Sequence, residues 1–131
     1  MPTRSLTFLL SVVVMLGAGE SAIKGHYAGA WSGTSGASGA FELSVAIAAD
    51  KPKCEISFTY GGEKVKTTVT LCKTSASNIE AQYDFDVDGN RLQSTIRGEL
   101  KDNALTGKYQ TKALADGSAV DEGDWKAAPA Q

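Results

Sequence analysis

The fold is decided by the stretch from Asn78 to Thr111, NIEAQYDFDVDGNRLQSTIRGELKDNALTGKYQT. Apolar and polar residues alternate along it, and two short turn signals, Gly89-Asn90 and Asp102-Asn103, divide it into three pieces. Alternation with a period of two is typical of a strand that buries one face. We therefore predict a three-stranded antiparallel meander, with strands over 79–87, 91–100 and 104–111.

The same alternation continues on both sides of this stretch. Further strands are predicted over 26–33, 40–48, 54–60, 64–72 and about 120–127, with a break at 50–53, a two-residue hairpin turn at Gly61-Gly62 and polar loops elsewhere. Consecutive short strands pair with their neighbours, and about eight of them can close on themselves and remove the exposed sheet edges. The sequence predicts an all-β domain, an antiparallel up-and-down meander closed into a small barrel; a β-sandwich is the alternative.

Turn positions also predict which inward residues face each other, because the length of a hairpin loop sets the register. A turn at 89–90 sets Tyr83 opposite Ile96 and Ala81 opposite Gly98, and one at 102–103 sets Gly98 opposite Gly107. Two inward rows follow, one large (Ile56, Thr67, Tyr83, Ile96, Tyr109) and one small (Val69, Ala81, Gly98, Gly107). The small row leaves room for a ring, so we expect the indole of Trp31 or Trp125 to pack over the two glycines.

The first residues have the features of an export signal. Arg4 precedes an apolar run over 6–16 and small residues at 17–19, which is the order of a secretory signal peptide. The run is too short to cross a bilayer. We predict a signal peptide over 1–19, cleaved between 18 and 22, a β-barrel domain over 26–127 and a tail over 128–131. The mature protein is expected to be secreted or periplasmic, with no membrane insertion.

Charge and cysteine content narrow the partners and the compartment. The formal net charge of −2 does not favour a nucleic-acid partner. The two cysteines, Cys54 and Cys72, both follow the signal, and an oxidising compartment favours a disulfide between them. Their strand parities differ, because Cys54 shares the inward parity of Ile56 while Cys72 shares the outward parity of Thr70. A disulfide therefore requires a bulge or a frayed strand end.

The segment 84–90, DFDVDGN, matches the first half of a calcium-binding loop. Thr95 occupies the position of the bidentate Glu that completes such a loop, and no helical pattern flanks it. We interpret the acids as a solvent-facing strand surface, with Asp84 opposite Lys66 and Asp86 opposite Lys64. No metal site is predicted.

Catalytic groups are scarce. His26 is the only histidine and lies at the start of a strand, so it is expected at the surface. Asp121, Glu122 and Asp124 surround Gly123 near the last predicted strand and are interpreted as a polar turn and edge, not as an acid/base pair. We predict no catalytic residue, no cofactor and no enzymatic activity.

Four motifs together resemble a known group of proteins. G-x-W-x-G spans Gly29 to Gly33, L-x-x-x-I-x-G-x-L spans Leu92 to Leu100, L-x-G-x-Y spans Leu105 to Tyr109, and G-x-W spans Gly123 to Trp125. The pattern resembles lipocalin-like (calycin-type) barrels and small secreted bacterial barrel domains of unknown function. The resemblance implies that Trp31 closes the floor of the barrel, either beside a ligand or simply as a core residue. Unlike true lipocalins, the chain has Lys126 where an Arg covers the Trp.

Three functional hypotheses follow. In the first, the protein is an exported binding module that holds a small apolar ligand between aromatic walls, with candidate ligand-binding residues Trp31, Phe58, Tyr83, Phe85, Tyr109 and Trp125. In the second, its loops bind a protein partner, as in the small barrel inhibitors of lysozyme and proteases that it resembles in size and disulfide content. In the third, it is a structural domain with a filled core. An open interior of several hundred cubic ångströms favours the first.

Overall fold

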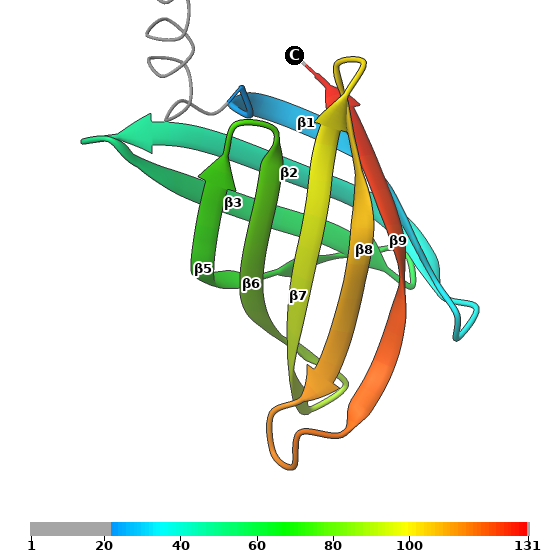
Figure 1. Cartoon of the computed structure of the whole chain (residues 1–131). Helices are drawn as coiled ribbons and strands as arrows, with labels where there is room; N and C mark the ends of the chain where they lie inside the picture. Colours follow the sequence, from blue (N-terminus) through cyan, green and yellow to red (C-terminus); the bar gives the residue numbers. More distant parts are fainter. Residues whose placement is uncertain (1–21, 131) are drawn as a thin grey trace, which may run out of the picture.

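The computed structural model describes residues 22–130, which form one antiparallel meander of nine strands and no helix. Figure 1 shows the strands wrapped into a nearly closed barrel. They are β1 (Gly25–Gly33), β2 (Ser38–Ala48), β3 (Lys51–Tyr60), β4 (Glu63–Lys66), β5 (Thr68–Ser75), β6 (Asn78–Val87), β7 (Asn90–Lys101), β8 (Ala104–Ala113) and β9 (Ala119–Pro129). The predicted all-β meander and barrel are thus confirmed, whereas the predicted signal peptide at 1–19 lies outside the described residues.

The barrel closes where the first and last strands meet. β1 pairs with β9 from Tyr27 opposite Pro129 to Gly33 opposite Gly123, and the sheet order is β4-β3-β2-β1-β9-β8-β7-β6-β5. The two edge strands, β4 and β5, are halves of one predicted strand, separated at Thr67. β4 pairs with β3, and β5 pairs with β6. One stretch of chain therefore switches partner midway, which explains nine strands where about eight were predicted.

Three predicted boundaries are wrong. The turn between β2 and β3 consists of Ala49 and Asp50, both with positive φ (52° and 65°), so residues 51–53 belong to β3 and do not break it. The turn between β6 and β7 is Asp88-Gly89, one residue earlier than predicted. At the other end of the domain, β9 continues to Pro129, which pairs with Tyr27, so the predicted tail begins too early. For β3 and β9, cross-strand pairing extends beyond the apolar run.

Because the turn lies one residue earlier than predicted, each residue of β6 faces a residue of β7 that is two positions earlier than the predicted partner. Tyr83 faces Ser94, and Ala81 faces Ile96, so Ala81 is not beside Gly98 as predicted. On the other side of β6, Tyr83 also faces Val69. The two predicted rows are therefore wrong wherever they cross β6. The predicted pairs of β7 with β8 are confirmed: Ile96 faces Tyr109 and Gly98 faces Gly107.

The indole of Trp125 lies across two neighbouring strands. Trp125 on β9 faces Gly107 on β8, which in turn faces Gly98 on β7. A Cβ added at Gly98 would be 2.5 Å from Cζ2 of the indole, and the indole nitrogen donates a hydrogen bond to the Lys108 carbonyl at 3.2 Å. Trp125 is only 2% exposed. The ring therefore uses the space that the glycines leave, as predicted, and ties β9 to β8 and β7.

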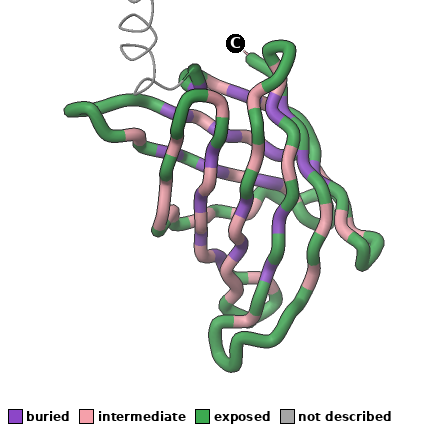
Figure 2. Tube along the Cα trace, viewed as in Figure 1, coloured by how far each residue is buried: buried purple, intermediate pink, exposed green. Residues whose placement is uncertain are grey.

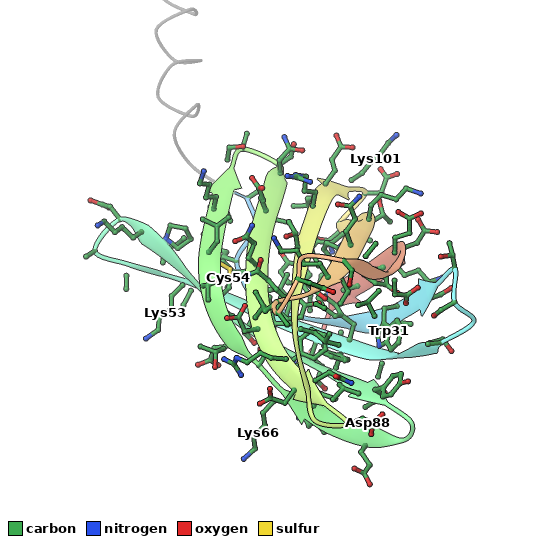
Figure 3. All side chains as sticks on the ribbon, turned by 90° about the horizontal axis from the view of Figure 1, so that it is seen from below. Trp31, Lys53, Cys54, Lys66, Asp88 and Lys101 are labelled. Atoms are coloured by element: carbon green, nitrogen blue, oxygen red, sulfur yellow. A yellow bond between two sulfur atoms is a disulfide. The ribbon has the colours of Figure 1, made fainter. Side chains whose placement is uncertain are left out.

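A disulfide between Cys54 on β3 and Cys72 on β5 spans the seam between the two ends of the sheet (Figure 3). Their Cα atoms are 5.8 Å apart. The strand breaks at Thr67, and the pairing of β5 with β6 shifts between Val69 and Leu71. This irregularity reverses the facing direction of the chain before Cys72, which meets the condition that the parity of the two cysteines imposed.

The two ends of the barrel differ in packing. Buried aliphatic side chains gather where β2, β5 and β7 end: Ile23, Leu43, Val45, Ile79, Leu105 and Ala127. Along most strands, more buried positions alternate with more exposed ones, as the colours of Figure 2 show, whereas β4 and β5 contain no fully buried position. We name the end of the barrel that holds these aliphatic side chains the packed end. The opposite end, where β1–β2, β3–β4, β6–β7 and β8–β9 are joined, is hollow.

Candidate functional site

The hollow end contains a cavity of about 470 Å³. Figure 3 views the molecule from this side, with Trp31 on β1 and Asp88 on the β6–β7 turn. All six aromatic residues proposed from the sequence line the cavity: Trp31, Phe58, Tyr83, Phe85, Tyr109 and Trp125. Phe41 and Tyr60 line it as well. Sequence parity places these rings inside, and the structure adds that they leave a space between them.

Trp31 organises one wall. Its ring is nearly perpendicular to those of Phe58 and Tyr109, with centroids 6.0 Å and 5.9 Å away. It is nearly parallel to Tyr60, at 6.5 Å and 21°. The indole nitrogen donates to the Thr59 carbonyl at 3.1 Å, which holds the ring in this orientation. Trp31 therefore forms a wall of the cavity, whereas the resemblance to lipocalin-like barrels implied that it would close the floor; aliphatic side chains fill the packed end instead.

A second group of rings forms the wall on β3 and β6. Phe58 and Phe85 meet edge to face, with centroids 4.9 Å apart at 81°. Tyr83 lies 5.9 Å from Phe85 and 6.2 Å from Phe58. Edge-to-face and tilted contacts are the preferred geometries of aromatic pairs. The ring of Phe58 on β3 thus contacts two rings of β6, a strand with which β3 does not pair, and the contacts make one continuous wall.

Three hydroxyl groups lie against this apolar wall. Ser94 on β7 and Thr111 on β8 hydrogen-bond to each other at 2.5 Å, and both side chains are buried. Ser94 also hydrogen-bonds to Tyr83, whose pKa is raised above the usual range because burial disfavours the phenolate. This group was not predicted from the sequence, although both residues have inward parity with Ile96 and Tyr109. Hydroxyl side chains at inward positions of apolar strands are the signal that would have indicated it.

A carboxylate lies at the opening of the cavity. Asp121 Oδ2 accepts a hydrogen bond from Tyr109 Oη at 2.8 Å, and Oδ1 accepts one from the Ser35 amide at 3.1 Å. The pKa of Tyr109 is raised by burial and by this carboxylate. A Cβ on Gly33 would overlap both Asp121 Oδ2 and Tyr109 Oη, so the bare backbone there makes room for the pair. Asp121 lies near the start of β9, within the strand predicted over about 120–127, and faces Thr111 on β8.

The acidic segment 84–90 is held by other partners than predicted. Asp86 pairs with Arg91 at 3.2 Å, and Asp84 accepts a hydrogen bond from Gln93 at 2.9 Å. Lys64 pairs instead with Glu42 on β2. The partners differ from those expected because Asp84 faces Thr68 on β5, whereas Lys66 on β4 faces Ser57 on β3. Among the described residues, no cluster of three or more His, Cys, Asp or Glu side chains is arranged to hold a metal ion.

His26 points to the outer side of β1, whereas the next residue, Tyr27, points inward. Its Nδ1 is 2.7 Å from Ser44 Oγ on β2, where the two residues face each other. This contact joins two outward positions of adjacent strands, and neither residue lines the cavity. The pair therefore plays no part in the candidate site.

No protein-family model, curated protein or solved structure matches this chain. Over residues 22–130 there is no helix with the length and apolar character needed to span a membrane. The disulfide fits an oxidising compartment outside the cytosol. Taken together, fold and site define a small, disulfide-linked antiparallel β-barrel with one packed end and an aromatic cavity at the other.

Proposed function

We propose that the protein is an exported binding module that holds a small, largely apolar molecule inside its barrel. The observation that carries this proposal is the cavity of about 470 Å³, which falls within the usual range of roughly 300–1,000 Å³ for small-molecule sites. Aromatic rings line most of it, and a few polar groups lie among them, which is the composition expected of such sites. A domain with a purely structural role gains nothing from leaving this space open.

The arrangement of polar groups indicates how a ligand would be oriented. Its apolar body would contact the rings of Trp31, Phe58 and Phe85, and a polar atom would reach the hydroxyls of Ser94 and Thr111. Because the two hydroxyls already bond to each other, each retains only part of its hydrogen-bonding capacity. The walls thus favour a molecule with a large apolar area and few polar groups.

Export is supported by two separate features. The chain begins with the charged, apolar and small-residue order of a signal peptide, and its cysteines form a disulfide. A secreted or periplasmic carrier is also what the resemblance to lipocalin-like barrels implies. We expect the mature chain to begin between residues 19 and 23, which N-terminal sequencing of the exported protein would test.

The binding proposal is tested with N-phenyl-1-naphthylamine, a neutral apolar dye that becomes fluorescent in apolar surroundings. We expect saturable binding to the mature protein. Ala37→Trp should block it, because Ala37 lines the cavity in the β1–β2 loop and packs against the core. Ala46→Trp is the matched control, since Ala46 is exposed on the outer face of β2.

Equal binding by both variants and the native protein would place the dye outside the cavity and refute the proposal. Absence of saturable binding to the folded native protein would refute it as well. In that case the alternative function, binding of a protein partner through the loops of the hollow end, would be favoured. The next experiment would be to capture such a partner.

A further inference from the structure

The charges at the cavity are all of one sign. Among the residues that line it, Asp88 and Asp121 are acidic and none is basic. Neither carboxylate takes part in an ion pair within the described part of the chain. Arg91, the basic residue next in sequence to the lining residue Asn90, is held by Asp84 and Asp86 on the outer surface. A charged ligand entering this end therefore meets only negative side chains among the lining residues.

Asp121 is held in place and aimed at the opening. Two hydrogen bonds fix its carboxylate, one from the Tyr109 hydroxyl on β8 and one from the Ser35 amide in the β1–β2 loop. Each oxygen accepts one of these bonds and retains a further lone pair. The side chain has neither the freedom of a surface Asp nor a basic partner to neutralise it. It is prepared to accept a hydrogen bond from a donor inside the cavity.

Aromatic faces surround the same region. Tyr109, which holds Asp121, is perpendicular to Trp31, and Trp31 is nearly parallel to Tyr60. Ring faces attract cations through their quadrupoles, most strongly at Trp, and the attraction grows when the cation is desolvated. A carboxylate beside aromatic rings can attract an ammonium group in two ways, by an ion pair with the carboxylate and by a cation–π interaction with the rings.

We propose that the ligand carries a protonated amine, which lies beside Asp121 and the ring faces of Trp31 and Tyr109 while its apolar body fills the aromatic interior. This inference rests on the proposed function, because it names the class of the molecule that the cavity holds. A carboxylate ligand such as a fatty acid is disfavoured, since it would meet like charges and no cation among the lining residues.

The test compares three molecules that share one apolar body and differ only at the head group: 4-phenylbutylamine, 4-phenylbutan-1-ol and 4-phenylbutanoate. The affinity of each molecule is measured from its displacement of N-phenyl-1-naphthylamine from the native protein at neutral pH and moderate salt. We expect the amine to bind best, the alcohol next and the carboxylate least, with roughly a ten-fold difference between amine and carboxylate. Added salt should reduce this difference, because screening weakens an interaction at a partly open site.

Asp121→Asn tests the residue. Asn keeps the shape: its amide oxygen can still accept from the Ser35 amide, and its NH2 group can donate to the Tyr109 hydroxyl, which accepts as well as donates. The cavity should therefore persist while the preference for the amine over the alcohol falls about five-fold or more. Asp102→Asn is the matched control, because it removes the same charge at the opposite, packed end, in a turn with a φ of 54° that Asn accommodates. That variant should keep the native order.

The outcomes separate this inference from the proposed function. If the dye and all three molecules fail to bind, the proposed function is refuted and the inference with it. If they bind with the carboxylate equal to or better than the amine, only the amine class is refuted. If the amine preference survives Asp121→Asn in a variant with native circular dichroism, Asp121 does not recognise the head group.

Discussion

Removing the disulfide should weaken the seam of the barrel more than any other region. The seam lies where the two ends of the sheet approach each other, and the Cys54–Cys72 bond joins β3 to the edge strand β5 across it. The perturbation is the double variant Cys54→Ser/Cys72→Ser, alongside the native protein reduced with a thiol. The cysteines are 18 residues apart, and a loop of this size lowers the entropy of the unfolded chain by the equivalent of about 3 kcal/mol at 25 °C.

The assay is urea denaturation of the oxidised, reduced and doubly substituted proteins, followed by circular dichroism. We expect both disulfide-free forms to lose about 3 kcal/mol of unfolding free energy, a large part of the total for a domain of this size. Hydrogen exchange supplies the local readout. The amides of β5 should lose protection at lower denaturant than those of β8, because β8 has a paired strand on each side and β5 has only one.

Thr67→Val is the companion variant. The Thr67 hydroxyl donates to the Ile56 carbonyl at 2.6 Å and so provides a further side-chain link at the point where the strand divides. Its loss should cost about 1 kcal/mol, and more in the disulfide-free background if the two links support the same seam. Equal unfolding free energies with and without the disulfide, or simultaneous loss of protection in β5 and β8, would show that the seam is not the weak point.

Other parts of the barrel give independent predictions. Gly98→Val should destabilise the domain by about 1–3 kcal/mol, because its side chain would overlap the Trp125 indole, and Trp125→Leu should recover part of the loss in a double-mutant cycle. The pKa of Tyr83 is raised in the folded state, so the unfolded chain loses this proton first. The contribution of Tyr83 to stability should be constant below about pH 10 and fall above it, so urea unfolding at several alkaline pH values should show a less steep loss of stability in Tyr83→Phe. Gly33→Ala should displace the Asp121 carboxylate and reduce amine binding while dye binding persists, as displacement titrations would show.

The turn at Asp88-Gly89 shows why register was harder to predict than strand identity. Asp88, Gly89 and Asn90 are all residues that accept positive φ, so the sequence allows a two-residue turn at either of two positions. In the structure Asp88 and Gly89 have φ of 52° and 80°, and Asn90 starts β7. At 102–103 only one position was favoured, and the prediction there was right. Local turn preference therefore predicts register only where a single turn is possible.

The sequence by itself determined the features that depend on neighbouring residues. Alternation identified the strands and the six inward aromatic rings, and the small residues Gly98 and Gly107 indicated the place of an indole. These properties are local or involve adjacent strands, since side chains alternate along each strand whatever the rest of the chain does.

Only the tertiary structure decided that one strand divides between two partners at Thr67, that Ser94 and Thr111 meet, and that Asp121 lies at the opening. It also decided that aliphatic side chains fill one end while the aromatic end stays open. Closure, and the volume left inside, depend on how side chains from strands far apart in the sequence add up in space. The periodicity of a single strand does not predict how much of the interior the side chains of all strands fill together.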